Sequence, residues 1–418
     1  MQNTLLRKGI GFTVILLFIG LSIPSTGRVL EQSSTVSSDG NTLYVGGSGE
    51  GNYSKIKDAI DNASDGDTVF VYNGTYYENI EVDKSISLVG EDKNITIIDG
   101  DYVKNHVLYL LDDNITVNGF TLRHAGGSRC GISISSSGNH VLNCKIKANN
   151  LRGIFISSDC NNNLISHCEV SENFGGIYVQ GWEEKYDFNN VISHCTFGPG
   201  DDVDLGRVKN TVVTDCTFYE SDITQDMGYG STYSNCVFNN PNTGIVFWDG
   251  AEDVSIVNCT FLNCSIDGIV VANAFMNNLT VQNCYFENCG MNGIVFGGYL
   301  EGCLISDCKF FNSTYNGIYF TTWMGKVEVT RCHFEGNDFG IEMDFRNWYN
   351  KFTKNNFINN NYHVWWGWYY VMLNYYNENY WDDWRGFGPY RVFYRSFRIL
   401  SFLSWDWHPA KAPYDIGG

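Results

Sequence analysis

The stretch Ile305–Phe320, ISDCKFFNSTYNGIYF, combines two short patterns that recur along the chain. A cysteine stands two residues before a phenylalanine, and the stretch ends on Gly-Ile-Tyr-Phe. The Gly-Ile pair recurs in steps of about 22–25 residues, apart from one gap of three periods. It begins at Gly131, Gly153, Gly176, Gly244, Gly268, Gly293, Gly317 and Gly340. A fixed period of this length indicates a repeat architecture rather than several independent domains.

The cysteine pattern, Cys-x-[Phe/Ile/Val], follows the same period. Its members are Cys144, Cys168, Cys195, Cys216, Cys236, Cys259, Cys284, Cys308 and Cys332, and Phe120 and Asn355 take the slot in further copies. Each copy contains three short runs with the alternation of strands, and no copy contains an amphipathic helix. The chain is therefore predicted to be all-β, a single-stranded right-handed parallel β-helix (β-solenoid) of about 12–14 coils.

The β-helix is predicted to span residues 42–365, with a cap at each end. Near its start, Ile56, Ala59, Ile60 and Ala63 share one helical face, which predicts a helix that covers the open end of the stack. Residues 366–418 lose the period and are rich in aromatic residues. We expect them to form an aromatic C-terminal cap, since solenoids need protected ends. A sugar-binding or wall-binding module is the alternative.

Segments at both ends of the chain resemble a known family. The stretch AIDNASDGDTVFVYNGTYYENI, with SISLVGE and NGFTL, resembles the N-terminal part of pectin-lyase-like β-helices. It is more similar still to NosD-type parallel β-helix surface proteins of archaea and bacteria. The ending NYYNENYWDDW…PYDI is similar to the closing segment of archaeal members. The resemblance covers residues 42–418 and implies the fold, but this fold serves lyases, hydrolases, adhesins and a copper-maturation accessory.

The N-terminus and the charge point to an exported protein. Arg7 and Lys8 precede the apolar run GIGFTVILLFIGLSI, so residues 1–27 are predicted to be a signal peptide or N-terminal anchor, followed by a linker at 28–41. We expect an extracellular, cell-surface or periplasmic location, with membrane contact only through this segment. The formal net charge of −19 disfavours nucleic acid and leaves cations, basic partners and neutral glycans. Of these, polysaccharide or glycan is the expected partner.

The repeated cysteine has three interpretations. A column of inward-facing cysteines packs as small apolar groups, which is the interpretation we favour. Export permits disulfides, but parallel side chains on stacked coils give a poor S–S dihedral angle. A thiolate metal site needs tetrahedral convergence, which a straight column does not provide. A second column, later in each coil, holds Cys264, Cys289, Asn149, Asn173, Ser313, Asn337 and Asn360.

One face of the β-helix is predicted to carry aromatic residues. In Gly-Ile-x-Phe the third residue faces outward, and this row reads Ser133, Phe155, Tyr178, Val246, Val270, Val295, Tyr319 and Glu342. The loops that follow add Trp182, Trp248, Phe275, Tyr299, Trp323, Phe345 and Trp348. Such a surface suits stacking of sugar rings, with Tyr178, Trp182, Trp248, Tyr319 and Trp323 as candidate contacts. The alternative is that the loops fold over the sheet and bury it.

The two coils that lack Gly-Ile contain GPGDDVDLGRVKN and ESDITQDMGYG. In register, Asp202 and Asp222 replace the glycine of successive coils, and Asp204 joins the outward row. With Arg207, they are candidate catalytic residues of a polysaccharide lyase or glycoside hydrolase. Asp201, Asp202 and Asp226 are candidate ligands of Ca²⁺, which is the candidate cofactor. Solvated acidic turns are the remaining interpretation.

The GDD and RVK elements are similar to motifs of polygalacturonases, but the Asn-Thr-Asp and Gly-His-Gly elements of that family are missing. No complete catalytic motif is therefore present. We accordingly favour a non-catalytic protein that binds glycan through the aromatic face, with a polysaccharide-cleaving enzyme as the first alternative.

A third set of residues immediately precedes the cysteines. His167, His194 and Asp215 lie in consecutive coils and are candidate ligands for copper or zinc. Arg331 in the same row favours an outward orientation. Because the copper accessory gives the resembled family its name, a periplasmic copper or metal accessory is the second alternative function.

Overall fold

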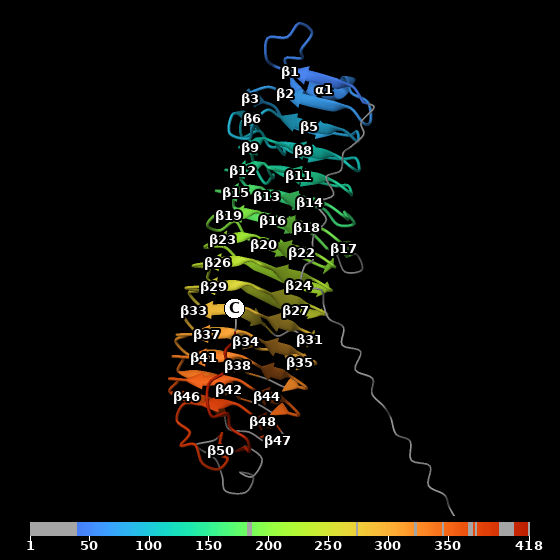
Figure 1. Cartoon of the computed structure of the whole chain (residues 1–418). Helices are drawn as coiled ribbons and strands as arrows, with labels where there is room; N and C mark the ends of the chain where they lie inside the picture. Colours follow the sequence, from blue (N-terminus) through green and yellow to red (C-terminus); the bar gives the residue numbers. More distant parts are fainter. Residues whose placement is uncertain are drawn as a thin grey trace, which may run out of the picture. The chain divides into compact units, whose positions relative to one another are not determined.

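The computed structural model describes residues 40–181, 186–272, 275–321, 324–344, 347–366, 371–372, 374–392 and 405–416. Residues 1–39, with the predicted signal peptide or anchor and most of the linker, lie outside the described residues. The described part is a stack of parallel coils, and α1 (Ile56–Asn62) is its only helix (Figure 1). The predicted all-β right-handed parallel β-helix is confirmed, with about 13 turns.

Each coil contributes strands to three parallel sheets, called A, B and C. In the coil of the opening stretch these strands are β36 (Leu304–Ser306), β37 (Lys309–Phe311) and β38 (Asn316–Phe320). The next coil supplies β40 (Glu328–Thr330), β41 (His333–Glu335) and β42 (Phe339–Met343). The pairing is in register: Ile305 lies beside Val329, Phe310 beside Phe334, and Ile318 beside Ile341. Equivalent residues of successive coils therefore form columns along the stack.

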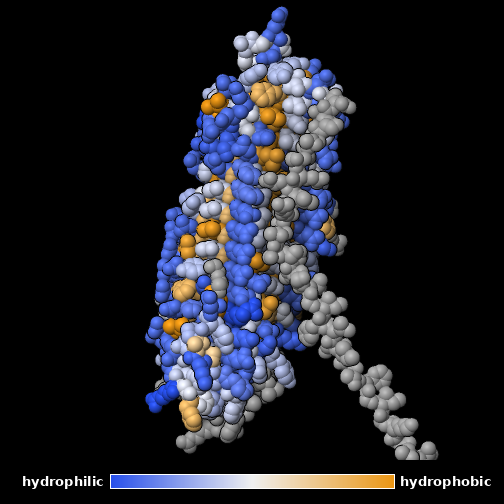
Figure 2. All heavy atoms as spheres, in the orientation of Figure 1, coloured by the Kyte–Doolittle hydropathy of each residue, from blue (hydrophilic) through white to orange (hydrophobic). Residues whose placement is uncertain are grey.

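The turn between sheets A and B requires a left-handed backbone. The residue before each ladder cysteine has φ near +50°, for example 57° at His167 and 55° at Asn235. Asparagine, the residue type that tolerates this conformation best after glycine, recurs there. The side chains at these turns project outward, and Figure 2 shows hydrophilic residues gathered in a column along the coils.

The interior consists of columns of identical side chains. The Phe286, Phe310 and Phe334 rings stack with centroids 4.8 and 4.9 Å apart, and all three are fully buried. All 14 cysteines are free and buried, which agrees with the packing interpretation. Burial raises the pKa of the Cys144 thiol well above its ordinary value, so this side chain packs as a neutral group.

The N-terminal end is covered by α1, as predicted. Ile56, Ala59 and Ile60 are buried on one side of this helix. They pack against the first coils, at β1 (Thr42–Val45) and β2 (Thr68–Val71). The described part of the chain contains no helix of sufficient length and apolarity to cross a bilayer.

At the other end the coils continue past residue 365, the predicted limit of the β-helix. Strand β49 (Tyr380–Trp381) pairs with the preceding coil, and the Trp381 ring stacks on Phe357 with centroids 4.5 Å apart. Asn379 takes the cysteine slot in this coil, where its Oδ1 accepts from the Asn355 backbone N–H. The last described segment then turns back, and the Tyr414 N–H donates to Asn356 Oδ1.

Sheet C changes near the middle of the stack. Strands β24 (Ile223–Tyr229) and β27 (Ile245–Glu252) are long enough to pair in two separate ladders of the sheet. Strand β24 belongs to the second of the two coils that lack Gly-Ile, and β27 belongs to the next coil, where Gly-Ile returns at Gly244. The two strands carry part of the candidate site.

Candidate functional site on sheet C

The outward row of sheet C has the predicted register. Tyr178 in β16 (Gly175–Val179) lies beside Asp204 in β20 (Val203–Leu205), which lies beside Thr224 in β24. Thr224 in turn lies beside Val246 in β27. Asp204 therefore occupies the outward row, while its neighbours Val203 and Leu205 are buried in the interior, as predicted.

Asp202 and Asp222 occupy the glycine slots immediately before β20 and β24. The Asp222 backbone N–H donates to Asp202 Oδ1 at 3.0 Å, so the two acids lie one above the other in successive coils. Thr224 Oγ1 donates to Asp204 Oδ1 at 2.6 Å. These contacts bring the three predicted catalytic aspartates together on one face; with Asp226, further along β24, we call them the acidic patch.

One cation of this patch is Arg152, in β13 (Arg152–Ile156), which the sequence did not single out. Its Nη1 lies 2.6 Å from Asp204 Oδ2, and its guanidinium lies 5.4 Å from the centre of the Tyr178 ring. Arg152 reaches past one coil because Gly175 has no side chain: a Cβ there would lie 2.1 Å from Nη1. Gly175 thus leaves open the space through which Arg152 meets Asp204.

Three carboxylates of the acidic patch have a raised pKa. Burial, with the nearby charges of Asp202 and Asp204, raises the pKa of Asp222 to about 7. Burial also raises the pKa of Asp202 and of Asp226. Asp204 makes an ion pair with Arg152 and accepts a hydrogen bond from Thr224. An acid that titrates near neutral pH therefore lies beside an ion-paired carboxylate on this face.

A β-bulge places an exposed aromatic residue beside the patch. The register of β24 and β27 shifts between Gln225 and Met227, and Trp248 falls in the shifted part of β27. Its side chain is 53% exposed. In the next coils Phe275, which is 58% exposed, stacks on Tyr299 with ring centroids 4.6 Å apart. A cleft of about 200 Å³ runs between these strands.

The other predicted residues of this face lie as follows. Tyr178 and Tyr319 are half-buried in the outward row, and the Tyr319 hydroxyl donates to Asp344. Arg207 lies close enough to Asp226 to oppose the rise of its pKa, and the ion pair of Asp204 is made by Arg152 instead. The predicted sugar contacts Trp182 and Trp323 lie outside the described residues.

Asp201 is separated from this outward surface. It is fully buried in the second column, where its Oδ1 accepts from Asn173 Nδ2 at 2.7 Å, as Asn173 accepts from Asn149. Burial raises the pKa of Asp201 to about 6, and its Oδ2 has no hydrogen-bond partner among the described residues. Asp201, Asp202 and Asp226 do not form a three-ligand group, so the arrangement does not fit the predicted Ca²⁺ ligand set.

The predicted copper or zinc ligands also fail to converge. The rings of His167 and His194 are exposed and stack face to face, with centroids 4.6 Å apart and planes 2° from parallel. Asp215, one coil further along, accepts from Thr214 Oγ1. Ring nitrogens bind a metal in the plane of the ring, and these two rings lie in parallel planes. The three residues also do not form a three-ligand group, so the set does not fit a single copper or zinc ion.

Two family models match the chain. "Right handed beta helix region" matches residues 186–301, and "Periplasmic copper-binding protein (NosD)" matches residues 60–223. The two matches together span residues 60–301, so the chain is a right-handed parallel β-helix protein that is similar to the NosD family. A search of curated protein sequences finds no significant match to this β-helix protein.

Solved structures with a similar fold include three that act on polysaccharides by name. The catalytic unit of an α-1,3-glucanase from Streptomyces thermodiastaticus is 12% identical, with a TM-score of 0.47, over 78% of this chain and 66% of its own. A mannuronan C-5 epimerase module from Azotobacter vinelandii is 14% identical, with a TM-score of 0.48, over 78% and 93%. A mannuronic acid-specific family 6 lyase from human gut microbiota is 13% identical, with a TM-score of 0.49, over 78% and 82%. The β-helix protein thus spans about two thirds of the glucanase unit.

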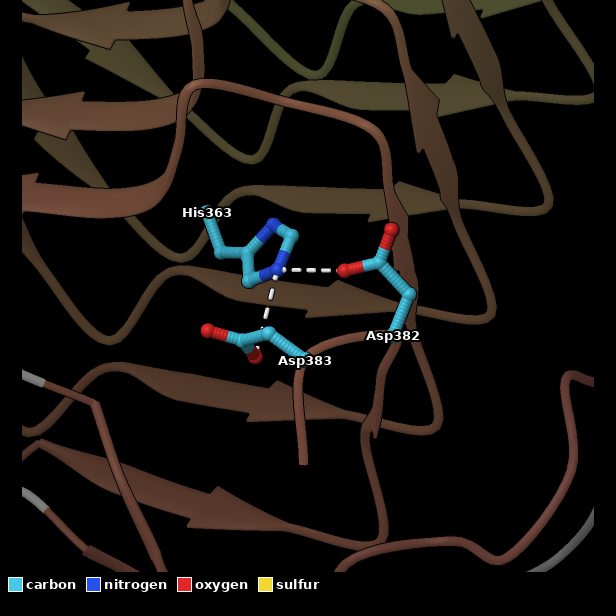
Figure 3. Close-up of side chains that lie close together, drawn as sticks. All are labelled: His363, Asp382 and Asp383. Carbon is cyan, nitrogen blue, oxygen red and sulfur yellow. Dashed lines mark ion pairs between the residues drawn. The ribbon is translucent and has the colours of Figure 1, made fainter. Parts of the chain in front are cut away.

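A second group of titratable residues, absent from the sequence predictions, lies at the C-terminal end of the β-helix protein. His363 in β46 (Tyr362–Trp366) faces Asp382 and Asp383, which follow β49 in the next coil (Figure 3). Among the described residues this is the only set of three whose potential ligand atoms all lie within 4.8 Å of one another. The Asp-Asp pair was visible in the sequence, but only the coil register brings it to His363.

Proposed function

We propose that the protein is an exported β-helix protein that binds polysaccharide along the outer face of sheet C. The single observation that carries this proposal is the exposed Trp248 at a β-bulge, one strand away from the acidic patch. An exposed indole offers a surface for a sugar ring, and carboxylates accept hydrogen bonds from sugar hydroxyls. The periplasmic name of the matching family supports export.

The charge of the chain narrows the glycan class. With a formal net charge of −19, the protein repels polyanions at neutral pH. The acidic patch adds to this repulsion at the site itself. We therefore propose a neutral polysaccharide as the ligand.

Affinity electrophoresis in gels that contain glucan, mannan, galactan, alginate or polygalacturonate tests the proposal. We expect at least one neutral polysaccharide to retard the protein and Trp248→Ala to remove most of the retardation. Trp407→Ala is the matched control, because Trp407 is also exposed but lies in the C-terminal segment. The proposal is wrong if no glycan retards the protein, or if both tryptophan variants behave alike.

A second candidate function is acid–base cleavage of the bound polysaccharide. It is favoured by the pKa of Asp222, raised to about 7, beside the ion-paired Asp204. A protonated Asp222 can donate to a leaving glycosidic oxygen while an ionised carboxylate activates water or attacks the sugar. Activity that depends on protonated Asp222 falls as pH rises through about 7.

Release of reducing ends or unsaturated sugars from the same polysaccharides tests cleavage. We expect Asp222→Asn to remove the release and Asp253→Asn, at an exposed turn, to leave it unchanged. Binding without any release would contradict cleavage while leaving the binding proposal intact.

A further inference from the structure

The cleft at the C-terminal end of the stack contains three side chains arranged as metal ligands. His363 Nε2 lies 2.9 Å from Asp382 Oδ1 and 3.4 Å from Asp383 Oδ1 (Figure 3). Two ligands of a tetrahedral Zn²⁺ ion, each about 2.0–2.2 Å from the metal, lie about 3.3–3.6 Å apart. The spacing to Asp383 falls in this range, and the spacing to Asp382 is shorter by about 0.4 Å. We propose that His363, Asp382 and Asp383 bind a divalent transition-metal ion of the Zn²⁺ type.

Each carboxylate is oriented by a separate donor, as metal ligands commonly are. The Asn359 backbone N–H donates to Asp382 Oδ2 at 2.6 Å. The Tyr390 hydroxyl donates to Asp383 Oδ2 at 3.3 Å. Both Oδ1 atoms are thereby directed at His363. Fixing the outer oxygen of a ligating carboxylate in this way is typical of the groups that surround and orient the ligands of a metal site.

The group combines two carboxylates with a buried imidazole. The His363 side chain is only 9% exposed, and its Nδ1 is buried without a partner among the described residues. A divalent ion bound between these side chains would balance the charge of the two carboxylates.

The donor set and the cleft define the kind of metal site. One imidazole and two carboxylates suit Zn²⁺ or a similar first-row ion, whereas Ca²⁺ prefers oxygen ligands alone and more of them. The cleft beside the group has a volume of about 440 Å³ and is also lined by Trp365 and Arg391. Three protein ligands beside an open cleft leave a coordination position for a ligand from solution.

Titration calorimetry of the metal-free full chain with ZnCl₂ tests the site, together with metal analysis after dialysis. We expect one saturable Zn²⁺ site, weakened about tenfold or more in Asp382→Asn, Asp383→Asn and His363→Gln. Tyr390→Phe removes the hydroxyl that orients Asp383 and keeps the ring, so we expect a smaller loss of affinity. Asp415→Asn, an exposed acid in the C-terminal segment, is the matched control and leaves binding unchanged.

The outcome does not depend on a variant that fails to fold. Asp383 is 62% exposed, so Asp383→Asn keeps the fold, which circular dichroism verifies. The proposal is overturned if the wild-type chain binds no Zn²⁺, if Asp383→Asn binds it as tightly as the wild type, or if Ca²⁺ binds this site equally well. None of these results bears on glycan binding by sheet C.

Discussion

The coils that contain Gly-Ile and the two coils that lack it differ at one slot. In the regular coils this slot is glycine because there is no room for a side chain. A Cβ at Gly293 would lie 2.6 Å from the Gly317 carbonyl oxygen and 2.6 Å from the Phe310 ring. In the other two coils the same slot holds Asp202 and Asp222.

The difference coincides with a shorter connection from sheet B to sheet C. Fewer residues separate Phe218 from Ile223 than separate Phe286 from Ile294. The shorter turn changes the path of the backbone before sheet C, and side chains appear where the regular coils exclude them. In the regular coils, packing requires glycine at this slot. In the shortened coils, the same slot accommodates a carboxylate, which can bind a ligand or transfer a proton.

The largest expected effect comes from placing a single methyl side chain at this slot in each kind of coil. Gly293→Ala forces a Cβ against backbone and ring, and we expect a loss of about 3 kcal/mol or more of stability. Asp222→Ala, in the same slot of a shortened coil, should cost less than about 1 kcal/mol because its pocket already accommodates a Cβ. Thermal denaturation of the two variants measures the contrast, and equal losses would erase the distinction between the coils.

A second prediction concerns the buried acid of a shortened coil. The pKa of Asp201 is raised to about 6 from an ordinary 3.8, so its contribution to stability is fully present below pH 4 and is lost as pH rises to about 6. Asp201→Asn continues the column of Asn149 and Asn173 without a charge. We expect it to stabilise the protein by about 1–3 kcal/mol at pH 8 and to have little effect at pH 4.

Denaturation of wild type and Asp201→Asn at both pH values measures this effect. Asn173→Asp is the reciprocal variant, which places an acid in the preceding coil and should be destabilising at pH 8. A stabilisation by Asp201→Asn that is the same at pH 4 and pH 8 would show that ionisation of Asp201 is not its cause.

A third prediction concerns one cation of the acidic patch. Arg152→Ala removes the ion pair with Asp204 and the contact with the Tyr178 ring. At pH 8 we expect a loss of about 1–2 kcal/mol, because Asp204 loses its ion-pair partner beside other acids. At pH 4 the loss should shrink because Asp202, Asp222 and Asp226, whose pKa values are raised, become protonated. Gly175→Ala displaces the Arg152 side chain and should act in the same direction; a loss independent of pH would point to packing instead.

The smallest expected effect is at the exposed histidine row. His167→Asn replaces a left-handed residue by the type most common at these turns, so we expect a change in stability within about 0.5 kcal/mol. Copper or zinc affinity should also be unchanged, since the two stacked rings do not converge on one ion. Calorimetric titration with each metal checks this, and a clear loss of affinity would restore the row as a metal site.

The fold was predictable because every coil repeats the same columns. Cys-x-Phe marks the strands of sheet B, and Gly-Ile marks the strands of sheet C. Because both patterns have the same period, they also specify how the strands of successive coils align. The last coil was missed because Asn379 and Trp381 replace Cys and Phe, which hides the pattern while keeping its geometry. The buried positions of the coil accept Asn and Trp in place of Cys and Phe, but a sequence pattern that requires Cys and Phe does not detect them.

The site was predictable only where it follows the register. Asp202, Asp204 and Asp222 occupy the slots that alignment on the cysteines assigned to them. Asp201 was predicted on the outward surface but lies in the buried column of Asn149 and Asn173. In this shortened coil the column position falls one residue later after the cysteine, and Asp201 takes the place of the asparagine. The contacts of Arg152 with Asp204 and of His363 with Asp382 join different coils. They depend on the length and direction of the side chains, which the spacing of residues in the sequence does not give.

The central claim is that polysaccharide binds to the outer face of sheet C at the shortened coils. Hydrogen–deuterium exchange, with and without the polysaccharide that binds most tightly, tests it most directly. We expect protection of β20, β24 and the bulge at Trp248, and no change in the regular coils of residues 299–344. Protection confined to sheets A and B, or to the C-terminal cleft, would contradict it.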